Sequence, residues 1–390
     1  MEASTELRAL YMDPSETGVR WMLDPNSSTV LNGLAAADHR SADTPCDVDA
    51  LIADVPDVLV LLRERHIGLA TGTADSGGLD KWATAWTGRL EAERPATWGA
   101  ALGTDLYQLR WLIGDNHLRA PGEDADLLRA TDRRGCELVH GREAGPWLQE
   151  QNLDGVLCLR LRQCGGPSRE AEQAMLQFQD DHARHFAHEK IIVDVRSNPG
   201  GSDEFVWKWI ANHVPHPVRY VSDQAWRYDG RRLAAWNLTV EQIAIAGQDS
   251  ISDLRRNNTP VPRPGAALAL ETDDETLAVG VSPWAGQMLV LTDRLTASAG
   301  ESTAWMLREA FNAKLIGGPT GGFLTFGDIT PYLLPRSGLV LGLATHRFGW
   351  RDVEMVGLRV DLTFDPRTPL PEIATSFDHL YAKACESSLG

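Results

Sequence analysis

The sequence predicts an α/β fold with a largely parallel sheet, preceded by a separate helical region. Two observations predict this class. Short β-branched runs, of which residues 191–195 are the clearest, alternate with segments that have the helical spacing of apolar residues. Such alternation is typical of a parallel sheet covered by helices. Within the first 120 residues, residues 1–45 are irregular and the rest contain helical patterns, so we expect a helical domain there.

The helical N-terminal domain is predicted over residues 1–120. Apolar side chains recur three and four positions apart within residues 48–66, 79–93 and 102–113, as the buried face of a helix requires. Residues 121–155, which follow, are mostly polar and charged. We expect them to form a linker or a surface cap.

The α/β core is predicted over residues 156–390. Strands are expected at residues 156–161, 191–195, 288–291, 314–318 and 338–348, and helices at residues 169–188, 205–213 and directly after Ser298. Residues 215–285 contain Pro, Asp and Trp in no clear pattern. We expect loops or a lid there.

Composition disfavours several classes of partner. The net charge of −17 at pH 7 argues against binding to a nucleic-acid backbone or an anionic membrane. No apolar run approaches the roughly 20 residues that cross a bilayer. The first residues are acidic and polar, unlike those of a signal peptide, so we expect a cytoplasmic location.

The five cysteines predict neither a disulfide framework nor a metal site. Their number is odd and their spacing is scattered, whereas zinc sites and disulfide scaffolds need regular pairs. His182, His185 and His188 lie three apart, and a polar helix face explains them more simply than a metal does. No cofactor is therefore predicted, and the oligomeric state is left open.

The most informative segment is residues 291–301, LTDRLTASAGE. A short apolar run leads through a turn into Ser298, and Ala304, Leu307 and Phe311 then predict a helix. Ser298 is thus expected at a helix N-terminus, where backbone N–H groups lack helical partners and favour negative charge. The serine is either a helix cap or a nucleophile.

A second segment, residues 191–202 (IIVDVRSNPGGS), passes from a strand through Asn-Pro-Gly-Gly into a helical pattern. Gly200 and Gly201 would let backbone amides approach a ligand closely, as an oxyanion hole requires. A plain strand-to-helix turn is the alternative. His117, just past a predicted helix, and Glu354 are by themselves ordinary surface residues.

Taken together and in this order, these segments resemble the tail-specific or C-terminal-processing serine peptidases. That family includes the core of tricorn protease and the interphotoreceptor retinoid-binding modules. LTDRLTASAGE resembles its nucleophile segment, and IIVDVRSNPGGS its Asp-x-Arg-x-Asn-x-Gly-Gly segment. LIGGPTGG, at residues 315–322, is similar to its Gly-Glu-x-Thr-x-Gly turn, and VEMVGLRVD, at residues 353–361, to its C-terminal acidic segment. The resemblance implies a core like those of crotonase and Clp protease.

The resemblance also implies which residues react. One branch of the family uses a Ser–Lys dyad, but Phe323 stands where that lysine lies. The other branch pairs the serine with a histidine and a glutamate. By this resemblance Ser298 is the nucleophile, His117 is the general base and Glu354 orients the base. A serine hydroxyl needs such a base, and the base needs a fixed tautomer.

The remaining implied positions surround these three. The amides of Gly200 or Gly201 and of Ala299 would form the oxyanion hole, and Asp115 and Asn116 are supporting positions next to the base. The family pattern is not complete: Gly318 and Val360 replace a usual Glu and a usual Pro.

The expected function is that of a serine hydrolase acting on an amide, peptide or related acyl bond. Residues 121–155 are too few for the peptide-binding PDZ module that this family often carries there, so a small peptide-like substrate is expected. The alternatives are a binding module of the same fold that holds apolar ligands without proteolysis, and an acyl-transfer, cyclase or esterase enzyme that modifies a small metabolite.

Overall fold

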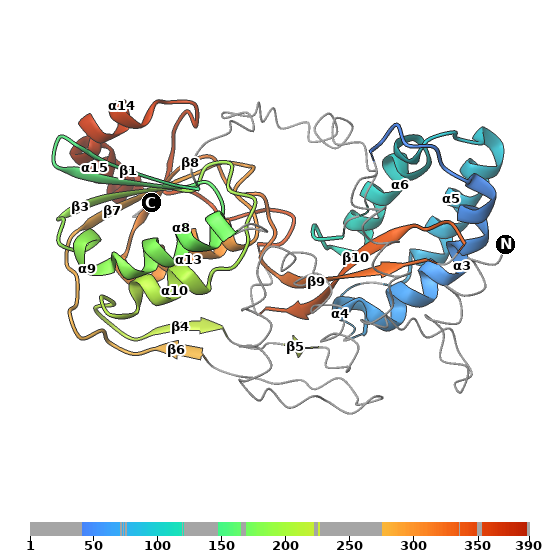
Figure 1. The fold of residues 1–390 in the computed structure, drawn as a ribbon, viewed down its shortest axis with the longest axis horizontal. Coiled ribbons are helices and arrows are strands. Elements are labelled where there is room, and N and C mark those ends of the chain that lie inside the picture. Colours follow the sequence, from blue (N-terminus) through green and yellow to red (C-terminus); the bar gives the residue numbers. More distant parts are fainter. Residues whose placement is uncertain are drawn as a thin grey trace. The chain divides into compact units, whose positions relative to one another are not determined.

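The protein contains two compact units, and neither is continuous in sequence. A computed structural model describes residues 41–120, 147–221, 225–226 and 275–387, apart from 71, 73, 75, 119, 165–168, 335 and 349–352. Of these, the first unit holds residues 41–120, 225–226 and 326–348, and the second unit holds the rest (Figure 1).

The first unit begins with four helices. They are α3 (Val48–Arg65), α4 (Ile67–Ala70), α5 (Leu79–Glu93) and α6 (Trp98–Ile113). The side chain of Asp47 caps α3 by accepting from the N–H of Ala50 at 3.1 Å. The apolar faces of the longer helices share one core that includes Leu62, Trp86 and Leu102. The helical N-terminal region is therefore confirmed.

Three strands from the second half of the chain complete this unit. The antiparallel strands lie in the order β5 (Ala225–Trp226), β10 (Val340–Arg347) and β9 (Phe326–Leu333). Leu339, Leu341 and Leu343 are buried in the same core as the helices. Asp54 of α3 accepts both the N–H and the hydroxyl of Ser337 at 2.7 Å. Residues 326–348 thus belong with the helices, whereas the sequence predicted one continuous core over residues 156–390.

The second unit is built on a six-stranded sheet. In spatial order its strands are β1 (Leu148–Leu153), β2 (Val156–Leu161), β3 (Lys190–Asp194), β7 (Gln287–Thr292), β8 (Lys314–Gly317) and β11 (Leu362–Thr363). β1 is antiparallel to β2, and every other neighbouring pair is parallel. Because the inner parallel strands are covered on both faces, their sequences are nearly continuous apolar runs. The predicted α/β class with a largely parallel sheet is confirmed.

Helices cover both faces of this sheet (Figure 1). One face carries α14 (Leu370–Thr375) and α15 (Phe377–Ser387), and the other carries α8 (Arg169–Asp180), α10 (Glu204–Ala211) and α13 (Ala299–Phe311), with the short α9 (His182–His185) after α8. Ile192 and Leu289 share a core cluster with Phe377. Their neighbours in sequence point to the opposite face, because side chains alternate along a strand. A separate antiparallel pair consists of β4 (Val218–Val221) and β6 (Glu275–Leu277).

Some predicted segments differ from the structure or lie outside the part it describes. β1 falls within the predicted linker. Its sequence LQEQNL lacks an apolar pattern because an edge strand exposes much of its surface. Residues 1–40, the linker residues 121–146, and residues 222–224 and 227–274 of the predicted lid lie outside the described residues. None of the described helices combines the length and apolar character needed to cross a membrane.

Candidate active site

Three loops of the second unit leave the carboxyl ends of adjacent parallel strands. They are residues 195–203 after β3, residues 293–298 after β7 and residues 318–325 after β8. In open parallel sheets, binding and catalytic groups gather at this edge. The first two loops carry Gly200, Gly201 and Ser298 of the predicted site.

Ser298 lies in a strained turn directly before α13. Its backbone has φ 51° and ψ −124°, a combination that costs an L-residue about 1–3 kcal/mol. Ser298 is the N-cap residue of α13 and forms a capping box with Glu301. In addition, the N–H of Glu301 donates to the Ser298 carbonyl at 2.8 Å, and the N–H of Gly300 donates to the Ala297 carbonyl at 2.9 Å. The serine is therefore a helix cap that also has a strained backbone.

Gly200 lies against this turn. A Cβ atom on Gly200 would be 2.8 Å from the Cβ of Ser298 and 3.1 Å from the carbonyl oxygen of Ala297. Gly200 has φ 111° and Gly201 has φ 132°, in the region that favours glycine. The close approach of the two turns therefore depends on the absence of a side chain at position 200.

The backbone N–H groups differ in their availability. The N–H of Gly200 donates to Oδ1 of Asn198 at 2.8 Å. The N–H groups of Gly201 and Ala299 have no hydrogen-bond partner in the part of the chain that the structure describes. Of the three amides predicted for an oxyanion hole, Gly201 and Ala299 are thus the available donors, and Gly200 provides the close approach.

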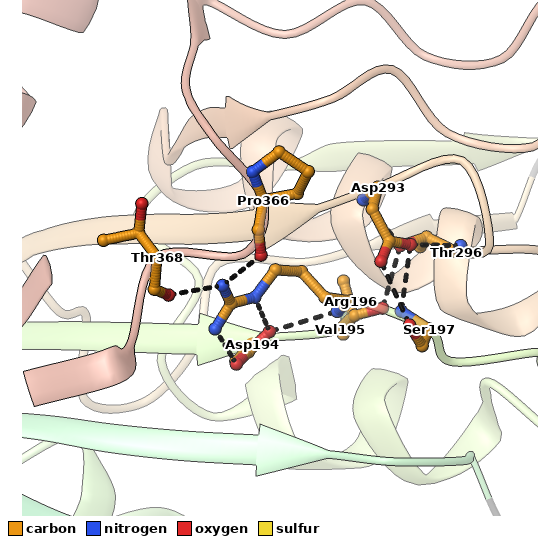
Figure 2. Close-up of polar contacts among 8 residues, drawn as sticks. All are labelled: Asp194, Val195, Arg196, Ser197, Asp293, Thr296, Pro366 and Thr368. Carbon is orange, nitrogen blue, oxygen red and sulfur yellow. Dashed lines mark hydrogen bonds and ion pairs between the residues drawn. The ribbon is translucent and has the colours of Figure 1, made fainter. Parts of the chain in front are cut away.

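Asp293 joins the two turns (Figure 2). Its carboxylate accepts the N–H of Ser197 at 2.9 Å and the Ser197 hydroxyl at 3.1 Å. It also accepts the N–H groups of Leu295 and Thr296, each at 2.9 Å. Sequence reasoning did not single out Asp293. The available signal was an Asp followed three residues later by Thr, a pattern typical of side-chain-stabilised turns.

Arg196 connects the first turn to the C-terminal segment (Figure 2). It donates to both oxygens of Asp194, at 2.8 and 2.6 Å, and to the carbonyls of Pro366 and Thr368, at 2.6 and 2.9 Å. Burial alone would lower the pKa of Arg196, but the hydrogen bonds and charge of Asp194 raise it above the usual value. The guanidinium therefore stays charged and holds the turn in place.

Glu354 is fixed to the third loop. Its carboxylate accepts the N–H of Thr325 at 2.7 Å. Next to it, the N–H of Met355 donates to the Gly322 carbonyl at 3.0 Å. Arg294 donates to the carbonyls of Thr320 and Val356, both at 2.7 Å, and so ties the two segments together. Glu354 thus has a defined position relative to the loops at this edge of the sheet.

His117, Asn116 and Asp115 follow the C-terminus of α6 in the first unit. Oδ1 of Asp115 accepts the backbone N–H of His117 at 2.6 Å and lies 3.9 Å from Nδ1 of its ring. Oδ2 of Asp115 is 2.8 Å from Nε2 of His66, a buried residue that sequence reasoning missed. Burial alone would raise the pKa of Asp115, but the hydrogen bond and charge of His66, with a further contribution from His117, lower it. Asp115 is therefore an ionised anchor for the backbone at His117.

The histidines of α9 do not converge on one ion among the described residues. Nδ1 of His182 is 2.9 Å from Nε2 of His213, whereas Nδ1 of His185 accepts from the Trp209 indole at 3.0 Å. Glu150 and Asp181 lie near His185, but Arg184 pairs with both carboxylates. This cluster is explained by ion pairs within the protein.

Comparisons with known proteins identify the family. The profile of Peptidase family S41 matches residues 155–355, which is more than half of the chain. The chain therefore belongs to peptidase family S41, and it is a serine peptidase. The match includes Ser298, the Asn-Pro-Gly-Gly turn and Glu354, as the resemblance seen in the sequence predicted.

Solved structures show the same fold at low sequence identity. A candidate peptidase from Parabacteroides merdae superposes with a TM-score of 0.51 at 11% identity, covering 80% of this chain and 90% of that one. Mature CPAF complexed with lactacystin superposes with a TM-score of 0.55 at 10% identity, covering 87% of this chain and 99% of that one. No curated protein sequence matches the chain significantly.

Proposed function

We propose that this peptidase cleaves an amide or related acyl bond of a small peptide-like substrate through Ser298, His117 and Glu354. The observation that carries the proposal is the strained conformation of Ser298 beside the N–H groups of Gly201 and Ala299, which have no partner among the described residues. A serine held at a sharp strand-to-helix turn presents its hydroxyl to a substrate, and backbone N–H groups beside it can donate hydrogen bonds to the carbonyl oxygen as negative charge develops on it.

The proposed reaction proceeds through an acyl-enzyme. His117 takes the proton of the Ser298 hydroxyl as Oγ attacks the substrate carbonyl, and the N–H groups of Gly201 and Ala299 stabilise the oxyanion. His117 then gives the proton to the leaving amine. Water, activated by the same imidazole, hydrolyses the ester and restores the serine. Glu354 accepts from the imidazole and holds its tautomer.

The residues around the proposed triad support these roles. The N–H of Thr325 occupies one oxygen of Glu354 and so restricts the carboxylate. In the first unit, Asp115 holds the backbone N–H of His117, and Asn116 lies between them in sequence. Phe323 is not ionisable, so the proposed base is His117 and not a lysine at that position.

We further propose a cytoplasmic location. The described cysteines, Cys46, Cys158, Cys164 and Cys385, are free thiols, as is usual in a reducing compartment. Burial raises the pKa of the Cys164 thiol to about 11, so that side chain is an inert packing group and does not compete with the serine as a nucleophile.

Labelling with a fluorophosphonate probe tests the proposed triad. We expect the wild type to be labelled at Ser298, Ser298→Ala to remain unlabelled, and His117→Ala and Glu354→Gln to be labelled about 10³–10⁴-fold more slowly. Circular dichroism and thermal unfolding of each variant check that the fold is kept. Unimpaired labelling of His117→Ala would contradict the assignment of the base.

The same experiment separates the alternative functions. Absence of labelling in the wild type, together with tight binding of an apolar fluorescent probe, would favour a binding module. Labelling followed by transfer of the acyl group to an added amine, detected by mass spectrometry of the products, would favour an acyl-transfer enzyme over a hydrolase.

A further inference from the structure

Glu301 is a fully buried carboxylate in the first turn of α13. It accepts four hydrogen bonds: from the N–H of Ser298 at 3.2 Å, the hydroxyl of Thr320, the N–H of Gly322 at 2.9 Å and the N–H of Phe323 at 2.6 Å. All four donors are neutral. Glu301 therefore connects the serine turn to the loop that follows β8.

An ordinary capping box does not explain this arrangement. A capping glutamate reaches back to the N–H of the N-cap residue, which accounts for one of the four bonds. The other three donors come from residues 320–323, on a different loop. Burying a carboxylate without a cation is costly, and burial raises the pKa of Glu301 to about 7 although all four hydrogen bonds act to lower it.

The loop held by Glu301 also holds the segment that carries Glu354. The hydroxyl oxygen of Thr320 accepts the N–H of Leu358 at 2.6 Å, and the carbonyl of Gly322 accepts the N–H of Met355 at 3.0 Å. One side chain thus links the backbone of Ser298 to the loop against which Glu354 is fixed.

We propose that Glu301 is a positioning residue that holds Ser298 in its strained conformation and keeps it in register with the loop that supports Glu354. The inference rests on the proposed function, because it assumes that Ser298 reacts. A sparsely populated backbone conformation persists only where several contacts determine it. The backbone N–H of Ser298 donates to the side chain of Glu301, and this is one of the contacts that determine the backbone conformation of the serine.

The expected effect of losing this bond follows from the peptide geometry. Oγ of Ser298 and the N–H of Ala299 are both attached to the Ser298 backbone, so a relaxation of its φ and ψ moves the nucleophile and an oxyanion donor together. A displacement of about 1 Å at a reacting group can cost about 100-fold in rate. Binding of the probe, which depends on other surfaces, is expected to change little.

The variant Glu301→Gln tests the proposal. Glutamine has nearly the same volume but only one acceptor oxygen, and its NH₂ group would face backbone N–H donors. With a fluorophosphonate probe, we expect the maximal labelling rate to fall about 10- to 100-fold, while the half-saturating probe concentration stays unchanged. Thr320→Val removes one of the four donors and keeps the contact with Ser298, so a smaller fall is expected.

Ser302→Ala is the matched control. Ser302 lies next to Glu301 in α13, and its hydroxyl donates to Asp203 at 2.7 Å and lies 3.2 Å from the carbonyl oxygen of Ala299. Its removal also deletes a buried hydrogen bond, but one that does not reach Ser298. We expect a wild-type labelling rate for this variant.

Hydrogen exchange keeps the test independent of catalysis. In a peptide that contains Ser298 and Ala299, we expect faster amide exchange in Glu301→Gln than in the wild type or Ser302→Ala. Wild-type labelling and wild-type exchange in Glu301→Gln and Thr320→Val would overturn the proposal and leave the triad intact. Labelling that persists in Ser298→Ala would overturn the proposed function, while the exchange rates would still decide whether Glu301 holds the turn. An equal loss of labelling in Ser302→Ala would show that Glu301 contributes only to general stability and does not position Ser298.

Discussion

The Cβ of Ser298 lies 2.8 Å from the position that a Cβ on Gly200 would occupy. We expect Gly200→Ala to reduce fluorophosphonate labelling to background. The carbonyl of Ala297 and the N–H of Ala299, at 3.1 and 3.2 Å from the same point, leave a methyl group no other space, so the serine turn must move.

Gly155→Ala is the control for backbone strain in the same unit. Gly155 has φ 83°, and a Cβ there would meet no atom within 4 Å outside the two neighbouring residues. The control is expected to lose about 1 kcal/mol of stability from its left-handed conformation and to keep its labelling rate. Equal loss of labelling in both variants would show that strain, and not contact with Ser298, is the cause.

Asp293 is expected to be essential for the stability of the two turns. Asp293→Ala leaves the N–H groups of Ser197 and Leu295 without their side-chain acceptor, whereas the N–H of Thr296 keeps the backbone carbonyl of residue 293. We expect the free energy of unfolding to fall by about 2–4 kcal/mol. Asp293→Asn keeps one acceptor oxygen, and its NH₂ group can donate to the Ser197 hydroxyl. Urea unfolding should therefore give the asparagine variant less than half of the alanine penalty; equal penalties would contradict the hydrogen-bond network of Figure 2.

The buried carboxyl group of Glu301 predicts a pH dependence of stability. Burial raises its pKa from the usual 4.5 to about 7. The folded protein thus holds this proton more tightly than the unfolded chain. The stabilising contribution is complete below about pH 4.5 and is lost as the pH rises through about 7. The shift corresponds to about 3 kcal/mol.

Comparison with Glu301→Gln isolates the contribution of this carboxyl group to the free energy of unfolding, because glutamine does not titrate. We expect the unfolding free energy of the wild type, relative to that of the variant, to decrease by about 3 kcal/mol between pH 4.5 and pH 7.5. Chemical unfolding at both pH values gives the measurement. A difference that stays constant with pH would show that the carboxyl group is not held in a raised-pKa environment.

The pair of His66 and Asp115 predicts a pH dependence of stability with the opposite sign. The pKa of Asp115 is lowered in the folded protein, so its contribution is present at neutral pH and is lost as the pH falls below the usual value of 3.8. His66→Leu leaves the buried carboxylate without its ring partner, and we expect a loss of about 3–5 kcal/mol at pH 7.

That penalty is expected to shrink towards pH 4, because burial then favours the protonated form of Asp115 in the variant. Thermal unfolding of His66→Leu at pH 4 and pH 7 measures the change. A penalty that grows in acid would contradict the assigned ionisation.

Local signals in the sequence predicted most of the secondary structure. The helix expected at residues 79–93 is α5 (Leu79–Glu93), and the strand expected at residues 156–161 is β2 (Val156–Leu161). Apolar spacing predicts such elements because a buried helix face, or a strand covered on both faces, requires apolar residues at regular positions in its own sequence. The packing of β9 and β10 against the N-terminal helices produces no such local pattern, since it depends on pairing between distant segments.

The candidate site divides in the same way. Ser298 and the glycines at positions 200 and 201 were singled out because a turn before a helix and a close backbone approach need particular residues at neighbouring positions. Asp293, Glu301 and His66 were not assigned roles. Each acts on backbone groups or side chains that are distant in sequence, and a single chain does not show which carboxylate or imidazole will reach them.

The four partners of Glu301 are uncharged, and none of the described Lys or Arg residues forms an ion pair with it. Dissolved ions weaken attractions between exposed charges, but they do not enter a site from which water is excluded. The turn around Ser298 should therefore keep its shape in concentrated salt, where surface pairs such as Arg63 with Asp80 lose their attraction. Ionic strength would then alter how a charged substrate approaches this peptidase without altering the geometry of the proposed nucleophile.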